Sequence, residues 1–197
     1  MISPSIDAAA ELRAALEDYE RTDNMGVLFD RVRALAAAVP PDRLKEACVP
    51  FRDRPEVIIP AYERIVSQTP HDAQALVVLA NAYWLTGRGP DVVGDLASRA
   101  IAADGANRGA WHLWALAESN VRERVARWQQ VAQRFPEDQI ARAALADNAA
   151  SLAGAEHDPL ALELAIRTYE GLLEESTQPA QRAALETALK TLREWKL

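Results

Sequence analysis

The sequence has little of what several classes of protein require. Its 197 residues include a single cysteine, Cys48, which excludes an intramolecular disulfide and a zinc site built from several cysteines. It contains no uncharged apolar run of about 18 residues, the length that a membrane-spanning helix needs. The first residues carry no basic segment and reach Asp7 before any long apolar run, unlike a signal peptide. These absences predict a cytoplasmic protein without a membrane partner.

Positive charge is also in short supply. The chain has 22 basic residues against 29 acidic ones, a net charge of −7, and no basic stripe stands out in either half. A nucleic-acid-binding surface replaces phosphate counterions with Lys and Arg, so this balance argues against a nucleic-acid partner. Few of the basic residues are lysine and alanine is abundant, a bias that fits a GC-rich bacterial genome.

Catalytic motifs are missing as well. The sequence has no phosphate-binding glycine loop, no H-E-x-x-H zinc helix and no nucleophile elbow. His71, His112 and His157 are expected in a turn, a helix and a loop of different structural units, which does not suggest a metal site. Cys48 is expected to be a small buried helix residue. We therefore predict no catalytic residue, no metal ligand and no cofactor.

Helical periodicity is what the sequence does have. Strand-type alternation is nearly absent, whereas apolar residues recur at spacings of three and four through most of the chain. Around the stretch ANAYWLTG the pattern is Leu76-x2-Leu79-Ala80-x2-Tyr83. It predicts a helix with an N-cap at Asp72 and a left-handed turn at Gly87. A different helical pattern precedes it, Ile58-x3-Tyr62-x2-Ile65-x4-Pro70.

Both patterns recur at consistent separations. The first returns from Leu12, Leu44, Trp111 and Arg142, and the second from Leu28, Val93, Arg124 and Ala165. In three places the interval from the centre of a second helix to the start of the next first helix is 14 residues: Tyr62 to Leu76, Ala97 to Trp111, and Trp128 to Arg142. A constant interval is expected where one helix pair stacks on the next.

These paired patterns resemble the tetratricopeptide repeat (TPR), a helix pair of about 34 residues. The resemblance implies an all-α, TPR-like α-solenoid of about five antiparallel helix pairs with a C-terminal capping helix. Residues 1–197 would form one domain, with divergent hairpins in 1–70, the best-matched units in 71–177 and the capping helix in 178–197.

Three local features modify this expectation. Pro50 and Pro60 predict that the second pair is short or kinked, because an interior proline loses a backbone hydrogen bond. The interval from Glu118 to Arg124 is too short for a standard turn and predicts a trimmed helix. The stretch SLAGAEHDP, residues 151–159, is expected to form a long loop that ends where a new helix starts and runs to about residue 175.

TPR arrays bind peptides or partner domains in a concave groove lined by their first helices, so the resemblance implies a non-catalytic protein-binding scaffold. Helical spacing gives the groove-facing positions of the best-matched pairs. They are Gln74, Val77, Asn81 and Trp84; then Gly109, His112 and Leu116; then Ile140, Ala143 and Asp147. Asn81 lies where the family often carries an asparagine that binds the ligand backbone. The Lys/Arg clamp of the chaperone-binding members is absent, so a chaperone tail is not the expected partner.

Several side chains admit two interpretations. Trp111, Trp114 and Trp128 are expected in the core, whereas Trp84 is either a core or a ligand-facing residue. The arginines of the 122–134 segment have carboxylates nearby and are interpreted as a solvated face: Arg122, Arg124, Arg127 and Arg134. Two other functions remain open. The first alternative to a partner-binding scaffold is a self-associating homo-oligomer. The second, less favoured, is an enzyme or small-ligand sensor that uses the groove around Trp84 and His112.

Overall fold

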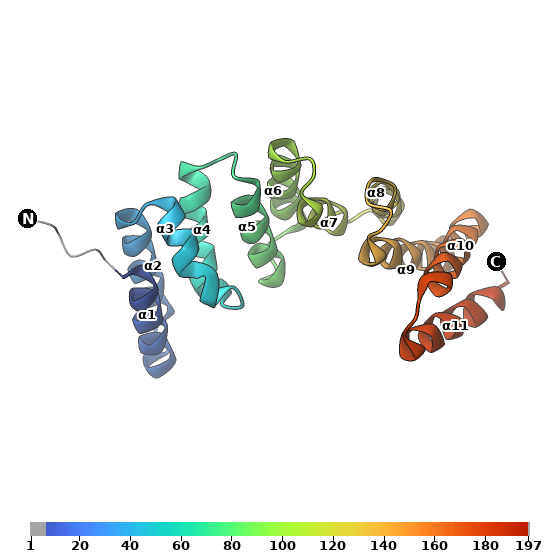
Figure 1. The fold of residues 1–197 in the computed structure, drawn as a ribbon, viewed down its shortest axis with the longest axis horizontal. Coiled ribbons are helices and arrows are strands. Elements are labelled where there is room, and N and C mark those ends of the chain that lie inside the picture. The colour runs from blue at the N-terminus through green and yellow to red at the C-terminus, as the bar shows by residue number, and fades with distance from the viewer. Residues whose placement is uncertain (1–6, 197) are drawn as a thin grey trace, which may run out of the picture. The chain divides into compact units, whose positions relative to one another are not determined.

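The computed structural model describes residues 7–196, which form helices and no strand (Figure 1). The α-helices are α1 (Ala8–Thr22), α2 (Met25–Ala38), α3 (Pro41–Cys48), α4 (Pro55–Gln68), α5 (Ala73–Leu85), α6 (Pro90–Ala103), α7 (Arg108–Leu116), α8 (Val121–Arg134), α9 (Gln139–Glu156), α10 (Pro159–Glu175) and α11 (Pro179–Arg193). The predicted all-α class is confirmed, and this order matches five helix pairs followed by one further helix. None of the helices in this described range has both the length and the apolar character to span a bilayer.

The chain divides into two compact units, Met1–Leu113 and Trp114–Leu197, with the boundary inside α7. Each unit is described by itself below. The predicted organisation as a single domain with three segments stays a prediction.

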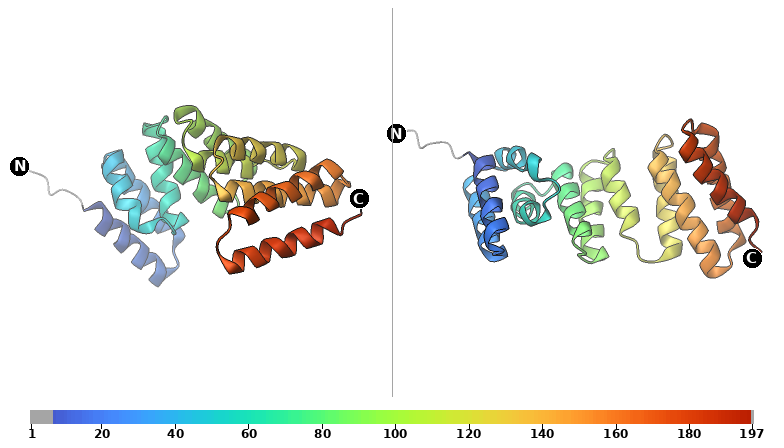
Figure 2. Two further views of the ribbon diagram at one scale, coloured as in Figure 1. Left: turned by 45° about the vertical axis from the view of Figure 1, so that its right-hand side comes forward. Right: turned by 90° about the horizontal axis from the view of Figure 1, so that it is seen from below.

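In the first unit, successive helices pack as antiparallel pairs (Figure 2). α1 packs on α2, α3 on α4 and α5 on α6, while α2 contacts α4 and α4 contacts α5. The apolar positions of the repeat point inward, and the largest fully buried side chains include Leu12, Leu44, Ile58 and Leu76. Each such side chain contributes about 1.5–3 kcal/mol by leaving water.

The ends of α5 follow the predicted signals. The Asp72 carboxylate accepts a hydrogen bond from the backbone N–H of Ala75 at 2.9 Å and caps the first turn. Gly87 adopts a left-handed φ of 73°, and the N–H of Arg88 donates to the carbonyl of Tyr83 at 2.9 Å. This closing bond satisfies a carbonyl at the end of α5, as in a Schellman motif. The N-cap and stop residue predicted from the sequence are both confirmed.

Proline shortens the second pair. α3 has eight residues and runs directly into a 3-10 helix, η1 (Val49–Phe51), which contains Pro50. α4 continues through its interior proline, Pro60, which is buried. The pair is therefore short, as predicted, because its first helix ends early.

In the second unit, α9 packs against both α8 and α10, and α10 packs against α11 (Figure 2). Trp128 lies in this core with 4% of its surface exposed, as expected. Trp111 and Trp114, expected in the core, are only half-buried. Their helix, α7, has nine residues, so the predicted trimmed helix is confirmed.

The long loop predicted for residues 151–159 is wrong. α9 continues to Glu156 because Leu152 and Ala153 extend the buried face of the helix. This burial outweighs the cost of Gly154 in a helix interior, about 1 kcal/mol. The chain turns at His157, which has a left-handed φ of 54°, and Asp158 then caps α10 as predicted.

Candidate partner-binding surface

One face of α5 carries the four predicted groove residues of the first unit. Gln74, Asn81 and Trp84 are exposed and Val77 is half-buried. They share a face because they are spaced by three, four and three residues. The opposite side of the helix is buried through Leu76 and its repeat-pattern neighbours. Trp84 keeps 37% of its surface exposed and so is not a core residue.

Asn81 presents an unused amide on this face. Within residues 7–196, its side chain makes no hydrogen bond to the chain. A primary amide can donate two hydrogen bonds and accept others, the complement of an extended peptide backbone. Asn81 and Trp84 therefore offer one polar and one apolar contact a single helical turn apart.

Two side-chain contacts anchor the two ends of α5. At its start, the Lys45 ammonium lies 2.8 Å from the Asp72 carboxylate and also pairs with Asp42. Hydrogen bonds to these two carboxylates raise the pKa of Lys45. At the other end of α5, the Tyr83 hydroxyl donates to Glu63 of α4 at 2.7 Å. Burial and then this hydrogen bond raise the pKa of Tyr83 to about 12, so it remains a donor at neutral pH.

The start of α7 approaches the same face. Cγ1 of Val77 lies 3.4 Å from the position that a Cβ on Gly109 would occupy. His112, half-buried, follows Gly109 by about one helical turn. The first unit thus brings Val77 of α5 beside Gly109 of α7, two of the predicted groove residues.

The other predicted residues lie in the second unit. Leu116 is half-buried, while Asp147 on α9 is exposed and accepts a hydrogen bond from the Tyr169 hydroxyl of α10. Of the neighbouring positions, Ile140 is exposed and Ala143 half-buried.

The thiol and the histidines do not assemble a reactive centre in the described chain. Cys48 is fully buried, as predicted, and burial raises the pKa of its thiol to about 12. It therefore stays protonated at neutral pH and is a poor nucleophile. His71 and His157 are exposed and lie in different units. Within residues 7–196, no group of three metal-ligating side chains could hold a metal ion.

The arginines of the 122–134 segment are engaged by other groups. Arg122 pairs with Glu156 and with Asp158. Arg127 lies 4.6 Å from the Trp114 ring centroid and 2.6 Å from the Glu118 carboxylate. They hold helix ends together instead of forming an open phosphate site.

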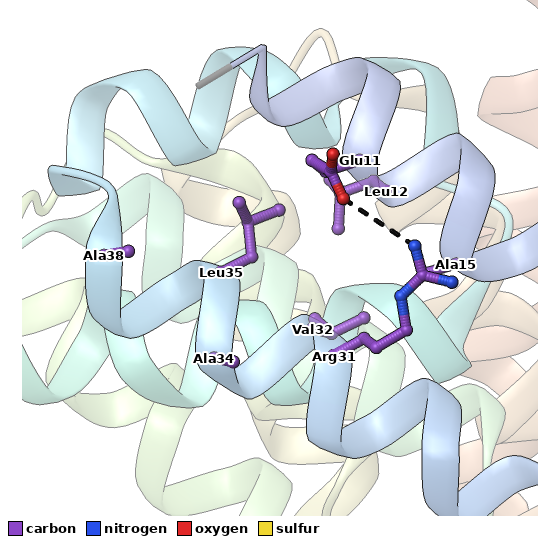
Figure 3. A pocket seen from close by; sticks show the side chains of 8 residues that line it. All are labelled: Glu11, Leu12, Ala15, Arg31, Val32, Ala34, Leu35 and Ala38. Carbon is purple, nitrogen blue, oxygen red and sulfur yellow. Dashed lines mark ion pairs between the residues drawn. The ribbon is translucent and has the colours of Figure 1, made fainter. Parts of the chain in front are cut away.

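Two hollows were not anticipated from the sequence. A cavity of about 370 Å³ lies between α1 and α2, with an apolar floor that includes Leu12 and Val32 (Figure 3). Arg31 spans its rim and pairs with Glu11 at 3.7 Å and with Asp18 at 2.5 Å.

The second hollow, called here the C-terminal slot, has a volume of about 300 Å³ and lies between α9, α10 and α11. Its lining residues are Ala150, Ser151, Tyr169, Ala188, Thr191, Leu192 and Trp195. The sequence signal for it was the continuation of small residues at helical spacing beyond Asp147, at Ala150 and Gly154. Treating residues 151–159 as a loop concealed that signal.

Comparison with known proteins supports the fold alone. No family model matches the chain, and no curated protein matches its sequence. Among solved structures, a crystal structure of MamA has 14% identity and a TM-score of 0.61, covering 82% of this chain and 96% of that one. A thermophilic TPR protein of Thermus thermophilus, TTC0263, has 15% identity and a TM-score of 0.53, covering 95% of this chain and all of its own (100%). The chain therefore has an all-α, TPR-like helical-repeat fold.

Proposed function

We propose that this chain is a non-catalytic scaffold that binds a protein or an extended peptide along the exposed face of α5. The observation that carries the proposal is the pair formed by Asn81 and Trp84. An unpaired amide can hydrogen-bond a peptide backbone, and an exposed indole adds a large apolar contact at low conformational cost. Aromatic side chains that become buried when a partner binds supply much of the energy of protein interfaces.

The remaining predicted residues extend this proposed surface. Gln74 and Val77 continue it along α5, and His112 adds a residue of α7 in the same unit. Leu116 and Asp147 are proposed partner contacts within the second unit. The contacts at Asp72 and Tyr83 favour such a role, because a binding face on an anchored helix loses less entropy when a partner docks. The cytoplasmic setting predicted from the single cysteine is part of the same proposal.

The test is the double substitution Asn81→Ala, Trp84→Ala. The principal partner is identified by affinity capture and mass spectrometry, and its affinity for the purified chain is then measured by calorimetry. We expect the double variant to bind at least about 30-fold more weakly, since such anchors contribute about 2 kcal/mol or more. Helical content and thermal stability should change little, because both side chains are exposed.

A neighbouring substitution is the matched control. Val92 is an exposed apolar residue of the next helix, α6, and is not part of the proposed face, so Val92→Ala should leave the affinity unchanged. Unchanged affinity in the double variant would overturn the proposal. Sedimentation at several concentrations tests the alternative of a self-associating repeat protein, which requires a mass that rises with concentration.

A further inference from the structure

The C-terminal slot combines two aromatic rings with aliphatic walls. Tyr169 of α10 and Trp195, just after α11, line it together with small residues of α9 such as Ala150. Trp195 is 37% exposed, so part of its indole surface is open to solvent. A volume of about 300 Å³ is at the lower limit of small-molecule pockets and suits one side chain better than a larger ligand.

The carboxylate of Asp147 lies on α9 about one helical turn before the slot residues Ala150 and Ser151. The Tyr169 ring lines the slot, and its hydroxyl donates a hydrogen bond to Asp147. Burial and then this hydrogen bond raise the pKa of Tyr169, which keeps the hydroxyl a donor. No Lys, Arg or His within residues 7–196 pairs with Asp147, which is exposed.

Several other carboxylates around these helices are paired with arginine. Glu175 binds Arg142, Glu170 binds Arg193 at 2.6 Å, and Glu156 binds Arg122 at 2.5 Å. Asp147 is therefore distinguished by having a hydrogen-bond donor but no compensating positive charge. A cation brought to it would meet attraction from the carboxylate.

We propose that the C-terminal slot binds a basic side chain, Lys or Arg, of the partner. The aliphatic stem of that residue lies between Tyr169 and Trp195, and its charged head reaches Asp147. Cations are attracted to the faces of tyrosine and tryptophan rings, and long basic side chains bury their stems along apolar surface. The inference rests on the proposed partner binding for its biological meaning, since it assigns a chemistry to Asp147, one of the proposed partner contacts of the second unit.

The test uses the full chain and no partner protein. The Trp195 indole N–H signal is assigned by Trp195→Phe in 15N-labelled protein and followed by NMR. The probes are Nα-acetyl-arginine methylamide and Nα-acetyl-lysine methylamide, with the citrulline analogue as the uncharged control, all at constant ionic strength. We expect a saturable shift with both cations, and we expect the citrulline analogue to bind about fivefold more weakly, the size of one exposed charge contact.

Asp147→Asn isolates the charge, because an amide oxygen can still accept from Tyr169. We expect this variant to bind the cations about fivefold more weakly. Glu137→Gln removes an exposed carboxylate from the turn before α9 and should bind like the unmodified chain. The inference is overturned if neither cation shifts Trp195 saturably, if citrulline binds equally well, or if Asp147→Asn has no effect. The titration needs no partner, so its outcome is independent of the α5 test. A failed titration would contradict the slot proposal alone, and a failed Asn81, Trp84 test would contradict the α5 proposal alone.

Discussion

The Trp195 indole packs against Gly154, with Cη2 and Cζ3 at 3.3 and 3.4 Å from the position of a Cβ on residue 154. Through this contact the residue just beyond α11 reaches α9, whose partner in the repeat is α10. Because Gly154 has no side chain, Trp195 can lie close to α9 and form one wall of the C-terminal slot.

Gly154→Ala tests the balance between helix propensity and this close contact. Alanine is favoured over glycine in a helix by about 1 kcal/mol, but the new methyl group requires Trp195 to shift by a few tenths of an ångström. Trp195 can shift because it follows the end of α11. Urea denaturation should show that Gly154→Ala raises the free energy of unfolding by about 0.5 kcal/mol in the unmodified chain. In a chain that already carries Trp195→Ala, the same substitution should raise it by about 1 kcal/mol. Equal changes in both backgrounds would show that the two residues are not coupled.

Deleting residues 178–197 should destabilise the second unit. α11 buries Leu189 and Leu192 and packs on α10, so its removal exposes apolar surface of the preceding helix. We expect a lower melting temperature or aggregation, measured by calorimetry and light scattering. A truncated chain that is monomeric and equally stable would show that α11 is not a cap.

Cys48 should make the protein less stable at alkaline pH. Burial raises the pKa of its thiol from 9.0 to about 12, so between these values the unfolded chain loses a proton that the folded chain keeps. The contribution of this thiol to the free energy of unfolding is complete below pH 9 and declines above it, by up to about 1.4 kcal/mol per pH unit. When unfolding is measured from pH 8 to about 10.5, the free energy of unfolding should fall less steeply with pH in Cys48→Ala than in the unmodified chain. The pKa of Tyr83 is also raised, so Tyr83 adds its own loss of stability at alkaline pH, and Tyr83→Phe measures that part separately.

Protonation of Asp72 at acidic pH should destabilise α5. Burial opposes ionisation of its carboxylate, but the hydrogen bonds from Lys45 and from the Ala75 amide prevail and lower its pKa below 3.8. Its stabilising contribution is present above pH 3.8 and is lost as the pH falls through the lowered value. Asp72→Asn keeps a good N-cap and removes the charge, so we expect a loss of about 1 kcal/mol at pH 7 that shrinks on acidification. A difference independent of pH would contradict this account of the Lys45 pair.

Much of the fold was determined by local sequence signals. The caps at Asp72 and Asp158 and the turn at Gly87 depend on atoms a few residues apart, so short motifs predict them. The repeated interval of 14 residues and the apolar spacing likewise predicted antiparallel pairs. Burial of Cys48 followed from its small-residue position in that pattern.

Other features were decided only by tertiary structure. Helix α9 passes through residues 151–156 because Leu152 and Ala153 find a core to enter, and local propensity around Gly154 does not reveal that core. The hydrogen bond from Tyr169 to Asp147 and the packing of Trp195 on Gly154 join different helices. The sequence alone contains each residue of the slot, but their proximity depends on how α9, α10 and α11 pack, since long-range contacts carry no fixed spacing along the chain.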